Sequence, residues 1–244
     1  MDGKLIVFEG VEGCGKTTQM QLCCEWLQSV GISVIMTREP GGTPLGLDLR
    51  RLLLEKSADK PIAEVTELLL YAADRSQHVN QELKPHLEQG KFILCDRYVE
   101  STIAYQGYGR RLNMSLIHQL NAIATGGLES DITLWLDIDV EVGLSRKSKG
   151  EAGLDRIEQE KIEFHRRVQQ GYAELAATNQ ERIARVDANL SKEAVQQQIQ
   201  AILSNRLGRW GDGEMGTTGV RCGGQLNLDN QHPTTNTQHP TPNK

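Results

Sequence analysis

Four residues near the start of the chain have the types and spacing that suit phosphate chemistry. The stretch VFEGVEGCGKTTQ contains the pattern G-x-x-x-x-G-K-T, which is formed by Gly10, Gly15, Lys16 and Thr17. In such a loop the glycines let backbone N–H groups face a phosphate, the lysine reaches the β- and γ-phosphates, and the threonine hydroxyl can hold Mg²⁺. The pattern predicts a phosphate-binding loop, although the same loop carries a carboxylate, Glu12, where an anion is expected.

Other charged residues follow apolar segments further along the chain. Asp96 and Arg97 end the run FILCDR, and Arg38 precedes the stretch EPGGT. A carboxylate in such a place suits Mg²⁺ or its water shell, and an arginine offers a planar pair of N–H donors to a phosphate. The alternatives are a turn-forming aspartate at the strand end and, for Arg38, a surface ion pair.

A basic segment between two helical stretches is a further candidate. The stretch SRKSKGEAGLDRIEQE places Arg146, Lys147, Lys149 and Arg156 around a glycine-containing run. Taken alone, such a charge run is usually a solvated surface. Beside a phosphate loop, it can close over the transferred phosphate, exclude water and neutralise charge. We therefore expect a mobile lid at about residues 146–156.

Five short apolar runs are available to position these side chains. They predict strands over residues 4–9, 32–37, 92–96, 132–138 and 182–188, with helical patterns between them and one beginning at Gly15. Strands that alternate with helices indicate a parallel sheet covered on both faces. Ligands of such folds bind beyond the carboxyl ends of the strands, which is where Glu9, Arg38 and Asp96 fall.

The composition indicates a globular chain. Its 244 residues are 38% apolar and 24% charged, with a formal net charge of -5. It has no basic stripe for nucleic acid, no apolar run of ~18 residues for a membrane, and no signal-peptide pattern. We therefore expect no nucleic-acid partner and no membrane. Five cysteines without metal or disulfide spacing favour a reduced, cytoplasmic protein.

The last part of the chain has a different composition. Gly, Thr, Asn, Gln and Pro dominate it, and it ends in QHPTTNTQHPTPNK. Such a composition cannot bury enough apolar surface to offset the entropy of ordering. We expect one folded domain over residues 1–207 and a low-complexity, disordered tail over 208–244. A tail that folds on a partner is the alternative.

Five motifs together resemble the thymidylate kinase family. The motifs occur in the order FEGVEGCGKTTQ, TREPGGTPLG, YAADR, DRYVESTIAYQGYGR and LDRIEQE. The resemblance runs from about residue 3 to about residue 205. It implies an α/β P-loop kinase fold with a five-stranded parallel sheet, helices on both faces and a mobile lid. It also implies transfer of the γ-phosphoryl group of ATP to dTMP with Mg²⁺, in an enzyme that is commonly a homodimer.

The resemblance assigns residues to each substrate. It implies that ATP is bound by Gly10, Val11, Glu12, Gly13, Cys14, Gly15, Lys16, Thr17 and Thr18. It implies that dTMP is bound by Glu12, Arg38, Tyr71, Arg75, Arg97, Ser101, Thr102, Tyr105 and Gln106. The implied Mg²⁺ residues are Thr17, Asp96 and Glu9, and the implied catalytic residues are Lys16, Arg97, Arg156 and Arg146.

Several of these residues have specific implied roles. By resemblance, Arg75 hydrogen-bonds a thymine carbonyl, and Tyr71, one helical turn before it, stacks on the base. Tyr105 crowds the place of a 2′-hydroxyl and so selects deoxyribose. Glu12 accepts a hydrogen bond from the 3′-hydroxyl of dTMP, which accounts for a carboxylate in the loop. The lid departs from the family because it is rich in lysine; Arg156 is the first candidate within it to reach the γ-phosphate.

Three other functions stay open on the sequence. The chain could phosphorylate UMP, AMP or GMP instead of dTMP. It could be a nucleotide-dependent switch, although the guanine-reading Asn-Lys-x-Asp motif that such a switch would need is not found. It could also be a purely structural domain with a phosphate loop.

Overall fold

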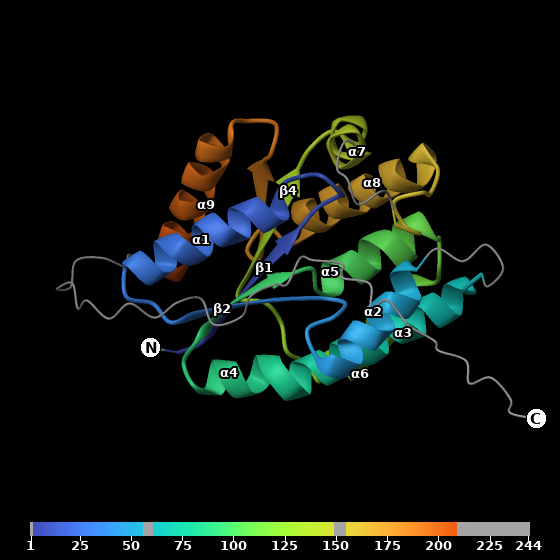
Figure 1. The fold of residues 1–244 in the computed structure, drawn as a ribbon, viewed down its shortest axis with the longest axis horizontal. Helices are drawn as coiled ribbons and strands as arrows, with labels where there is room; N and C mark the ends of the chain where they lie inside the picture. Colours follow the sequence, from blue (N-terminus) through green and yellow to red (C-terminus); the bar gives the residue numbers. More distant parts are fainter. Residues whose placement is uncertain (1, 56–60, 149–154, 209–244) are drawn as a thin grey trace, which may run out of the picture.

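The computed structural model describes residues 2–55, 61–148 and 155–208. The expected tail from residue 209 and part of the expected lid, including Lys149, lie outside the described residues. A five-stranded parallel sheet forms the centre of the molecule, in the order β2-β3-β1-β4-β5 (Figure 1). The strands are β1 (Lys4–Glu9), β2 (Val34–Arg38), β3 (Phe92–Asp96), β4 (Ile132–Asp137) and β5 (Ile183–Asp187).

Helices cover both faces of the sheet, as the alternation of strands and helices predicts. The connection after β1 is α1 (Lys16–Ser29), and α8 (Ile162–Thr178) and α9 (Lys192–Leu207) flank β5 in the sequence. The remaining elements are α2 (Pro44–Leu54), α3 (Glu64–His78), η1 (Val79–Leu83), α4 (Lys84–Glu88), α5 (Val99–Thr102), η2 (Ile103–Gly109), α6 (Met114–Thr125) and α7 (Val140–Ser148). Both η elements are π-helices that continue an α-helix without a break.

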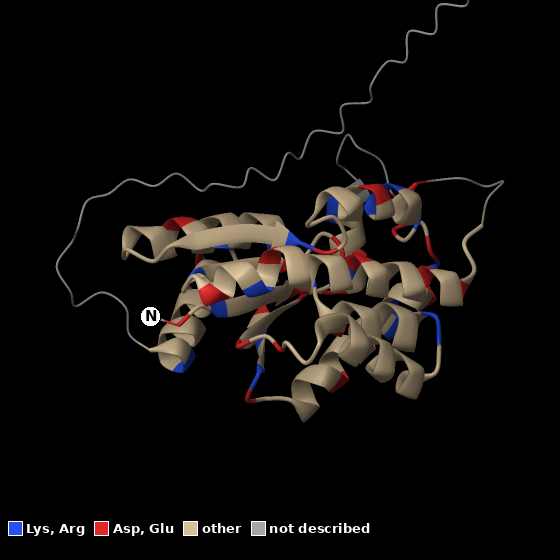
Figure 2. Ribbon diagram, turned by 90° about the horizontal axis from the view of Figure 1, so that it is seen from below, with Lys and Arg blue, Asp and Glu red and all other residues tan. Residues whose placement is uncertain are grey.

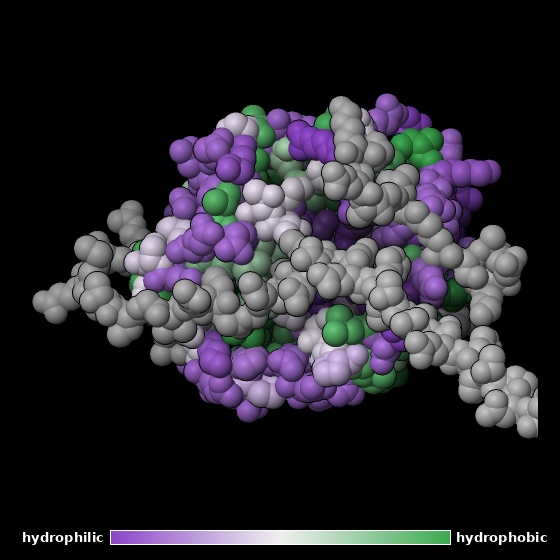
Figure 3. Space-filling model, viewed as in Figure 1, coloured by the Kyte–Doolittle hydropathy of each residue, from purple (hydrophilic) through white to green (hydrophobic). Residues whose placement is uncertain are grey.

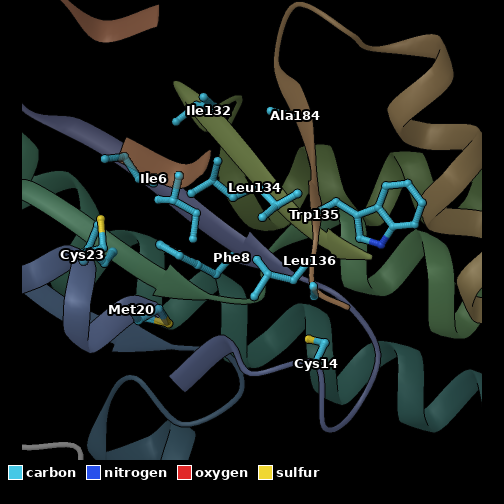
Figure 4. Close-up of a cluster of buried hydrophobic side chains, with 14 of the residues drawn as sticks. Ile6, Phe8, Cys14, Met20, Cys23, Ile132, Leu134, Trp135, Leu136 and Ala184 are labelled. Atoms are coloured by element: carbon cyan, nitrogen blue, oxygen red, sulfur yellow. The ribbon is translucent and has the colours of Figure 1, made fainter. Parts of the chain in front are cut away.

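The core forms on both faces because successive side chains of a strand point to opposite sides. Ile6 belongs to a large cluster with side chains of α1, α8 and α9, whereas its neighbour Leu5 packs in a second cluster against η1. Figure 4 shows the larger cluster, with Phe8 of β1, Leu134 of β4 and Met20 of α1. Strands buried on both faces explain why the sequence shows continuous apolar runs instead of alternation.

The second strand begins later than its apolar run predicts. The sequence favours a strand over residues 32–37, but β2 runs from Val34 to Arg38. Ile32 donates its backbone N–H to the carbonyl of Leu27, at 3.0 Å, and so closes the end of α1 instead of pairing in the sheet. Gly31, with a φ of 83°, makes the turn that this closure needs. The strand is therefore shifted toward Arg38, at the carboxyl edge of the sheet.

The described surface mixes acidic, basic and apolar side chains. Figure 2 shows Lys and Arg interspersed with Asp and Glu along the helices, and Figure 3 shows mainly hydrophilic residues with separate apolar spots. Of the exposed large apolar residues, most lie on the adjacent helices α2, α3 and α6: Leu45, Leu47, Leu52, Val65, Leu69, Leu116 and Ile123. Among the described residues, no helix is both long and apolar enough to cross a membrane.

Candidate active site

A cavity of about 430 Å³ opens at the carboxyl ends of β1, β2 and β3. It brings together side chains from segments that lie far apart in the sequence. The sequence-predicted residues that line it are Glu12, Gly13, Gly15, Lys16, Thr17, Thr18, Arg38, Tyr71, Arg75, Asp96, Arg97, Ser101, Thr102, Tyr105, Gln106 and Arg146. Gly10, Val11, Cys14, Glu9 and Arg156 are not among the described residues that line it.

The phosphate loop depends on glycine where the backbone curls. Gly10, Gly13 and Gly15 have φ values of 142°, 72° and 93°, which side chains strongly disfavour. A Cβ on Gly13 would also lie 2.0 Å from the carbonyl oxygen of Gly143, on α7. α1 begins directly after Gly15, so its free N–H groups and positive dipole end point at the cavity.

Lys16 is buried at the base of the loop. Its Nζ donates to the carbonyl oxygens of Gly10, at 3.1 Å, and Val11, at 3.4 Å. It also lies 3.7 Å from the Sγ of Cys14. The loop backbone thus fixes the position of the ammonium group at the N-terminus of α1. An anion there would interact with both the ammonium group and the positive end of the helix dipole.

Arg97 connects the phosphate loop with the rest of the cavity. Its backbone has a φ of 72°, unusual for a residue with a side chain. Its Nη1 donates to the carbonyl oxygen of Gly10 and to the hydroxyls of Ser101 and Tyr172, at 3.1–3.2 Å. Its Nη2 donates to the carboxylate of Glu12 and to the Tyr105 hydroxyl. The strained backbone therefore directs one guanidinium into a network that spans the site.

Glu12 faces the cavity from inside the loop. Burial acts to raise its pKa, but the positive charges of Arg97, Lys16 and Lys147 outweigh burial and lower its pKa to about 2. The hydroxyl of Tyr105 also donates to it, at 3.2 Å. An ionised carboxylate only accepts hydrogen bonds, so Glu12 offers an acceptor to a ligand hydroxyl.

Glu9 lies beneath the cavity, fully buried at the end of β1. Its Oε1 accepts the backbone N–H groups of Tyr98 and Ser101, and its Oε2 accepts the hydroxyls of Ser101 and Tyr172. Burial is the main reason that its pKa rises to about 7, against the lowering effect of Arg97. In this structure both of its oxygens therefore hold the segment after β3 that carries Arg97 and Ser101.

Asp96, the last residue of β3, has a carboxylate oxygen with no partner within the described ranges. Its Oδ1 is buried and makes no hydrogen bond with the described residues. Asp96 and Thr17 line the same cavity, so a carboxylate and a hydroxyl face the space beside the phosphate loop. A cation held there would satisfy the buried oxygen.

Arg75, on α3, lines the cavity and is held in place by four hydrogen bonds. Its guanidinium donates to Glu39, to Thr102 and Asn121, and to the carbonyl oxygen of Tyr98, all at 2.7–2.8 Å. These four bonds use four of the five N–H groups of an arginine, and the second N–H of Nη2 has no acceptor among the residues described. The remaining donor is held rigidly, in a residue that is only 2% exposed.

The EPGG loop after β2 is held by α3 through residues that the sequence analysis missed. Glu39 accepts one hydrogen bond from the Nε of Arg75, at 2.8 Å, and its other oxygen lies 2.9 Å from the Nδ1 of His78. Asp74 accepts the backbone N–H of Gly41, at 3.0 Å, and its Oδ2 is buried with no hydrogen-bond partner in the part of the chain that the structure describes. Burial and the charge of Glu39 raise the pKa of Asp74 to about 6. The loop position is thus fixed from α3, which a sequence reading sees only as EPGG and YAADR.

Arg50 on α2 is another lining residue that the sequence analysis missed. It lines the cavity beside Arg38, and its Nη1 donates to the carbonyl oxygen of Pro40, at 3.0 Å. Burial and then the charge of Arg50 lower the pKa of Arg38, whose Nε has no partner among the described residues. Two neighbouring guanidiniums favour an anion between them. The helical stretch around Arg50 carries no motif that would have marked it.

Some basic residues of the expected lid line the cavity, whereas Arg156 is bound outside it. Arg146 and Lys147, near the end of α7, line the cavity, as do Asp155, Ile157 and Glu158. Arg156, the first candidate to reach the γ-phosphate, instead donates its Nε to the carbonyl oxygen of Leu53 and its Nη2 to Glu67. The physical reason is the charge of Glu67, a carboxylate that is 1% exposed and requires cationic partners.

Comparison with known proteins gives a consistent result. A model of the family described as thymidylate kinase matches residues 8–199. A thymidylate kinase from Nostoc sp. (strain PCC 7120) is 76% identical over 210 residues, which cover 86% of this chain and all of the relative. One from Trichodesmium erythraeum is 58% identical over 225 residues, covering 86% of this chain and 99% of the relative. The crystal structure of thymidylate kinase from Ehrlichia chaffeensis superposes with a TM-score of 0.68 at 34% identity, covering 83% of this chain and 99% of that one.

Proposed function

This chain belongs to the thymidylate kinase family and phosphorylates dTMP to dTDP with ATP as the donor, and from that premise we propose how its residues divide the work. In the reaction an oxygen of the dTMP phosphate forms a bond to the γ-phosphorus as the bond to the leaving ADP oxygen breaks. The protein's task is to bring two anions into line and to stabilise their charge. The observation that carries the proposal is the bond between Arg97 and Glu12, because it joins the phosphate loop to the acceptor side of the cavity.

On the donor side, we assign the loop from Gly10 to Thr18 to the phosphates of ATP. The backbone N–H groups at the start of α1 would bind the β-phosphate, and Lys16 would bridge the β- and γ-phosphates. The hydrogen bonds of Lys16 to Gly10 and Val11 support this role, since they keep its ammonium at the loop. Val11 and Cys14 contribute backbone, and their buried side chains pack in the core.

We assign Mg²⁺ to the side of the loop where Thr17 and Asp96 line the cavity. The unpartnered Oδ1 of Asp96 supports the fit, since Mg²⁺ is usually held by one or two carboxylates together with substrate phosphates. Mg²⁺ would neutralise phosphate charge during transfer. Glu9, the third residue assigned to the metal, would serve from behind as the acceptor that fixes Ser101 and Tyr98.

On the acceptor side, we assign Arg38 and Arg97 to the phosphate of dTMP, with Arg50 as an additional partner. Two observations support an anion site. The Nε of Arg38 has no partner among the described residues, and the positive charge of Arg50 is close enough to lower the pKa of Arg38. Arg97 lies between this site and the phosphate loop, where charge builds up on the transferred group. Arg146, which lines the cavity, is our lid-side arginine, since Arg156 would first have to leave Glu67 and Leu53.

We assign the nucleoside to the remaining wall of the cavity. Tyr71 would stack on the base, Arg75 would donate its remaining N–H to a carbonyl, and Thr102 and Gln106 would meet the base edge. Glu12 would accept the 3′-hydroxyl. Tyr105, whose hydroxyl is tied to Arg97 and Glu12, would occupy the space of a 2′-hydroxyl. Ser101 would act indirectly, through its bond to Arg97.

We also propose that the enzyme is a cytoplasmic homodimer. Most of the exposed large apolar residues lie on α2, α3 and α6, with α3 packed against both other helices, and a second copy of the chain could bury them. ATP and dTMP are intracellular substrates, and the four described cysteines are free thiols, which fits a reducing compartment.

A substrate panel tests the function. We expect ADP formation with dTMP and Mg-ATP, and a rate at least about tenfold lower with UMP, because Tyr105 excludes the 2′-hydroxyl. dUMP is the matched control, since it differs from UMP only in that hydroxyl and from dTMP only in the 5-methyl group. Equal rates with dUMP and UMP would refute the role of Tyr105, and equal rates with dTMP and UMP would refute the acceptor specificity.

A further inference from the structure

Glu67 on α3 is a buried carboxylate shared by three segments of the chain. Its Oε1 accepts the Nε2 of Gln106, at 2.8 Å, and the Nε of Arg110, at 3.3 Å. Its Oε2 accepts the Nη2 of Arg110, at 3.3 Å, and the Nη2 of Arg156, at 2.5 Å. Glu67 itself does not line the cavity among the described residues, but Gln106 does. It can therefore act on a bound base only through Gln106.

The charge of Glu67 determines which way the amide of Gln106 points. An ionised carboxylate only accepts hydrogen bonds, so the NH₂ group of Gln106 must face it. The Oε1 of Gln106 is then on the other side, and it makes no hydrogen bond with the described residues. Because Gln106 is 2% exposed and lines the cavity, its amide presents an acceptor to a bound ligand.

Two arginines keep Glu67 ionised. Burial alone would raise the pKa of Glu67, but Arg110, the hydrogen bond from Gln106 and Arg156 outweigh burial and lower it. Arg110 is in turn held by Glu160, at 2.5 Å, and Arg156 by the carbonyl oxygen of Leu53. The orientation of the amide is thus enforced by a network that includes both the segment after η2 and the segment after the lid.

We propose that Glu67 is a positioning residue that sets base selectivity, by holding the Gln106 amide with its oxygen toward the base. The proposal rests on the proposed function. A thymine edge offers N3–H as a donor between two carbonyl acceptors, whereas cytosine offers a bare N3 acceptor beside an amino donor. An amide oxygen therefore accepts from thymine and opposes cytosine. Arg75, as a donor, matches the thymine carbonyl in the same way.

Glu67→Gln provides a direct test. The oxygen of the new amide would take the place of Oε2, where the Nη2 groups of Arg110 and Arg156 both donate. Its NH₂ would then take the place of Oε1 and face Gln106, with the Nε of Arg110 also beside it. The Gln106 amide would then turn its own NH₂ toward the base. We expect the ratio of kcat/KM for dTMP to that for dCMP to fall by about tenfold, the scale of one hydrogen bond. A ratio of two substrates measured on one preparation cancels any loss of folded enzyme.

Two further variants control the interpretation. Glu67→Asp keeps an acceptor-only group, so it should retain the dTMP-to-dCMP ratio even where both rates fall. Glu160→Gln removes a charge from the same network without touching Gln106, and it should leave the ratio unchanged. An unchanged ratio in Glu67→Gln, or an equal fall in Glu160→Gln, would overturn the proposal.

The native enzyme supplies a second measurement that needs no variant. dUMP and dCMP share the sugar and the phosphate and both lack the 5-methyl group, but dCMP has no N3–H, and we expect its kcat/KM to be about tenfold below that of dUMP. Equal use of the two would overturn the orientation of Gln106, and this comparison decides the matter if Glu67→Gln does not fold. Failure of the proposed function would look different, since the native enzyme would then not phosphorylate dTMP at all.

Discussion

Arg97 is the residue that connects the phosphate loop with other segments that line the cavity. Its position after β3 was predicted, because an arginine at a strand end beside a phosphate loop suits phosphate binding. Its left-handed backbone and its bonds to Gly10, Glu12 and Tyr172 were not, since these partners lie 75 to 87 positions away in the sequence. A local sequence pattern predicts that an arginine follows a strand, but it does not predict which distant residues that arginine will bond to.

Arg97→Lys should lower kcat/KM for dTMP by about 100-fold, or roughly 3 kcal/mol of transition-state stabilisation. Lysine keeps the positive charge but cannot donate to both sides of the network as a guanidinium does. Steady-state kinetics with dTMP and ATP measures the effect. Arg51→Lys, at an exposed position of α2, is the matched control and should be close to the native enzyme. Comparable activity of the two variants would contradict the role given to Arg97.

Asp74 makes stability depend on pH. Its pKa is raised from 3.8 to about 6, chiefly by burial, so the folded state holds a proton that the unfolded state releases. The stabilisation is complete below about pH 4 and is lost as the pH rises through 6, by up to roughly 3 kcal/mol. Asp74→Asn should remove this loss while keeping an acceptor for Gly41.

Urea denaturation between pH 4 and 7.5 tests this prediction for Asp74. The free energy of unfolding of Asp74→Asn relative to the native protein should increase with pH across the window. Asp48→Asn, at an exposed site on α2, reports the effect of losing one charge without burial. A difference between Asp74→Asn and the native protein that stays constant with pH would refute the account.

At the scale of elements, the sheet was predictable and the way in which helices approach the loops was not. β1, β3 and β4 appear in the sequence as apolar runs because both faces of a parallel sheet are covered. The start of β2 was misplaced because Ile32 is apolar yet closes α1 instead of pairing with β3. The contact of α7 with the phosphate loop left no local signal, since it depends on two glycines, Gly13 and Gly143, in distant segments.

Gly143→Ala should impair ATP use even though alanine normally favours a helix over glycine. A Cβ on Gly143 would lie 2.4 Å from the carbonyl oxygen of Glu12 and would push α7 away from the phosphate loop. We expect the KM for ATP to rise by about tenfold, equivalent to roughly 1.4 kcal/mol. Val142→Ala, at an exposed position of the same helix, is the control. Unchanged kinetics with a higher melting temperature would mean that the close contact is unimportant.

At the scale of the whole molecule, the apolar residues of α2, α3 and α6 predict self-association. Leu69 lies on α3, the helix that packs against both others, and is 49% exposed. Leu69→Glu should shift the protein from dimer to monomer in analytical ultracentrifugation, because a charge would be buried in the interface. Leu190→Glu alters an equally exposed leucine between β5 and α9 and should leave the dimer intact. A native protein that sediments as a monomer would refute the homodimer.

The length of the folded domain is a second prediction at this scale. The described elements end with α9 at Leu207, and the family model matches only as far as residue 199. A chain ending at Gly208 should therefore keep its kcat/KM for dTMP and its melting temperature. Both are measured against the full chain. A large fall in either would mean that residues 209–244 contribute to the domain or to its assembly.

The close approach of Gly13 to Gly143 limits how the phosphate loop could be transplanted. The segment from Gly10 to Thr18 looks self-contained in the sequence, but its backbone has the carbonyl of Gly143 pressed against it from α7. A graft that carried only the loop and α1 into another scaffold would meet a side chain at that point in most helices. A graft that works would have to include both the phosphate loop and the start of α7. These two segments are far apart in the sequence and meet only in the folded chain.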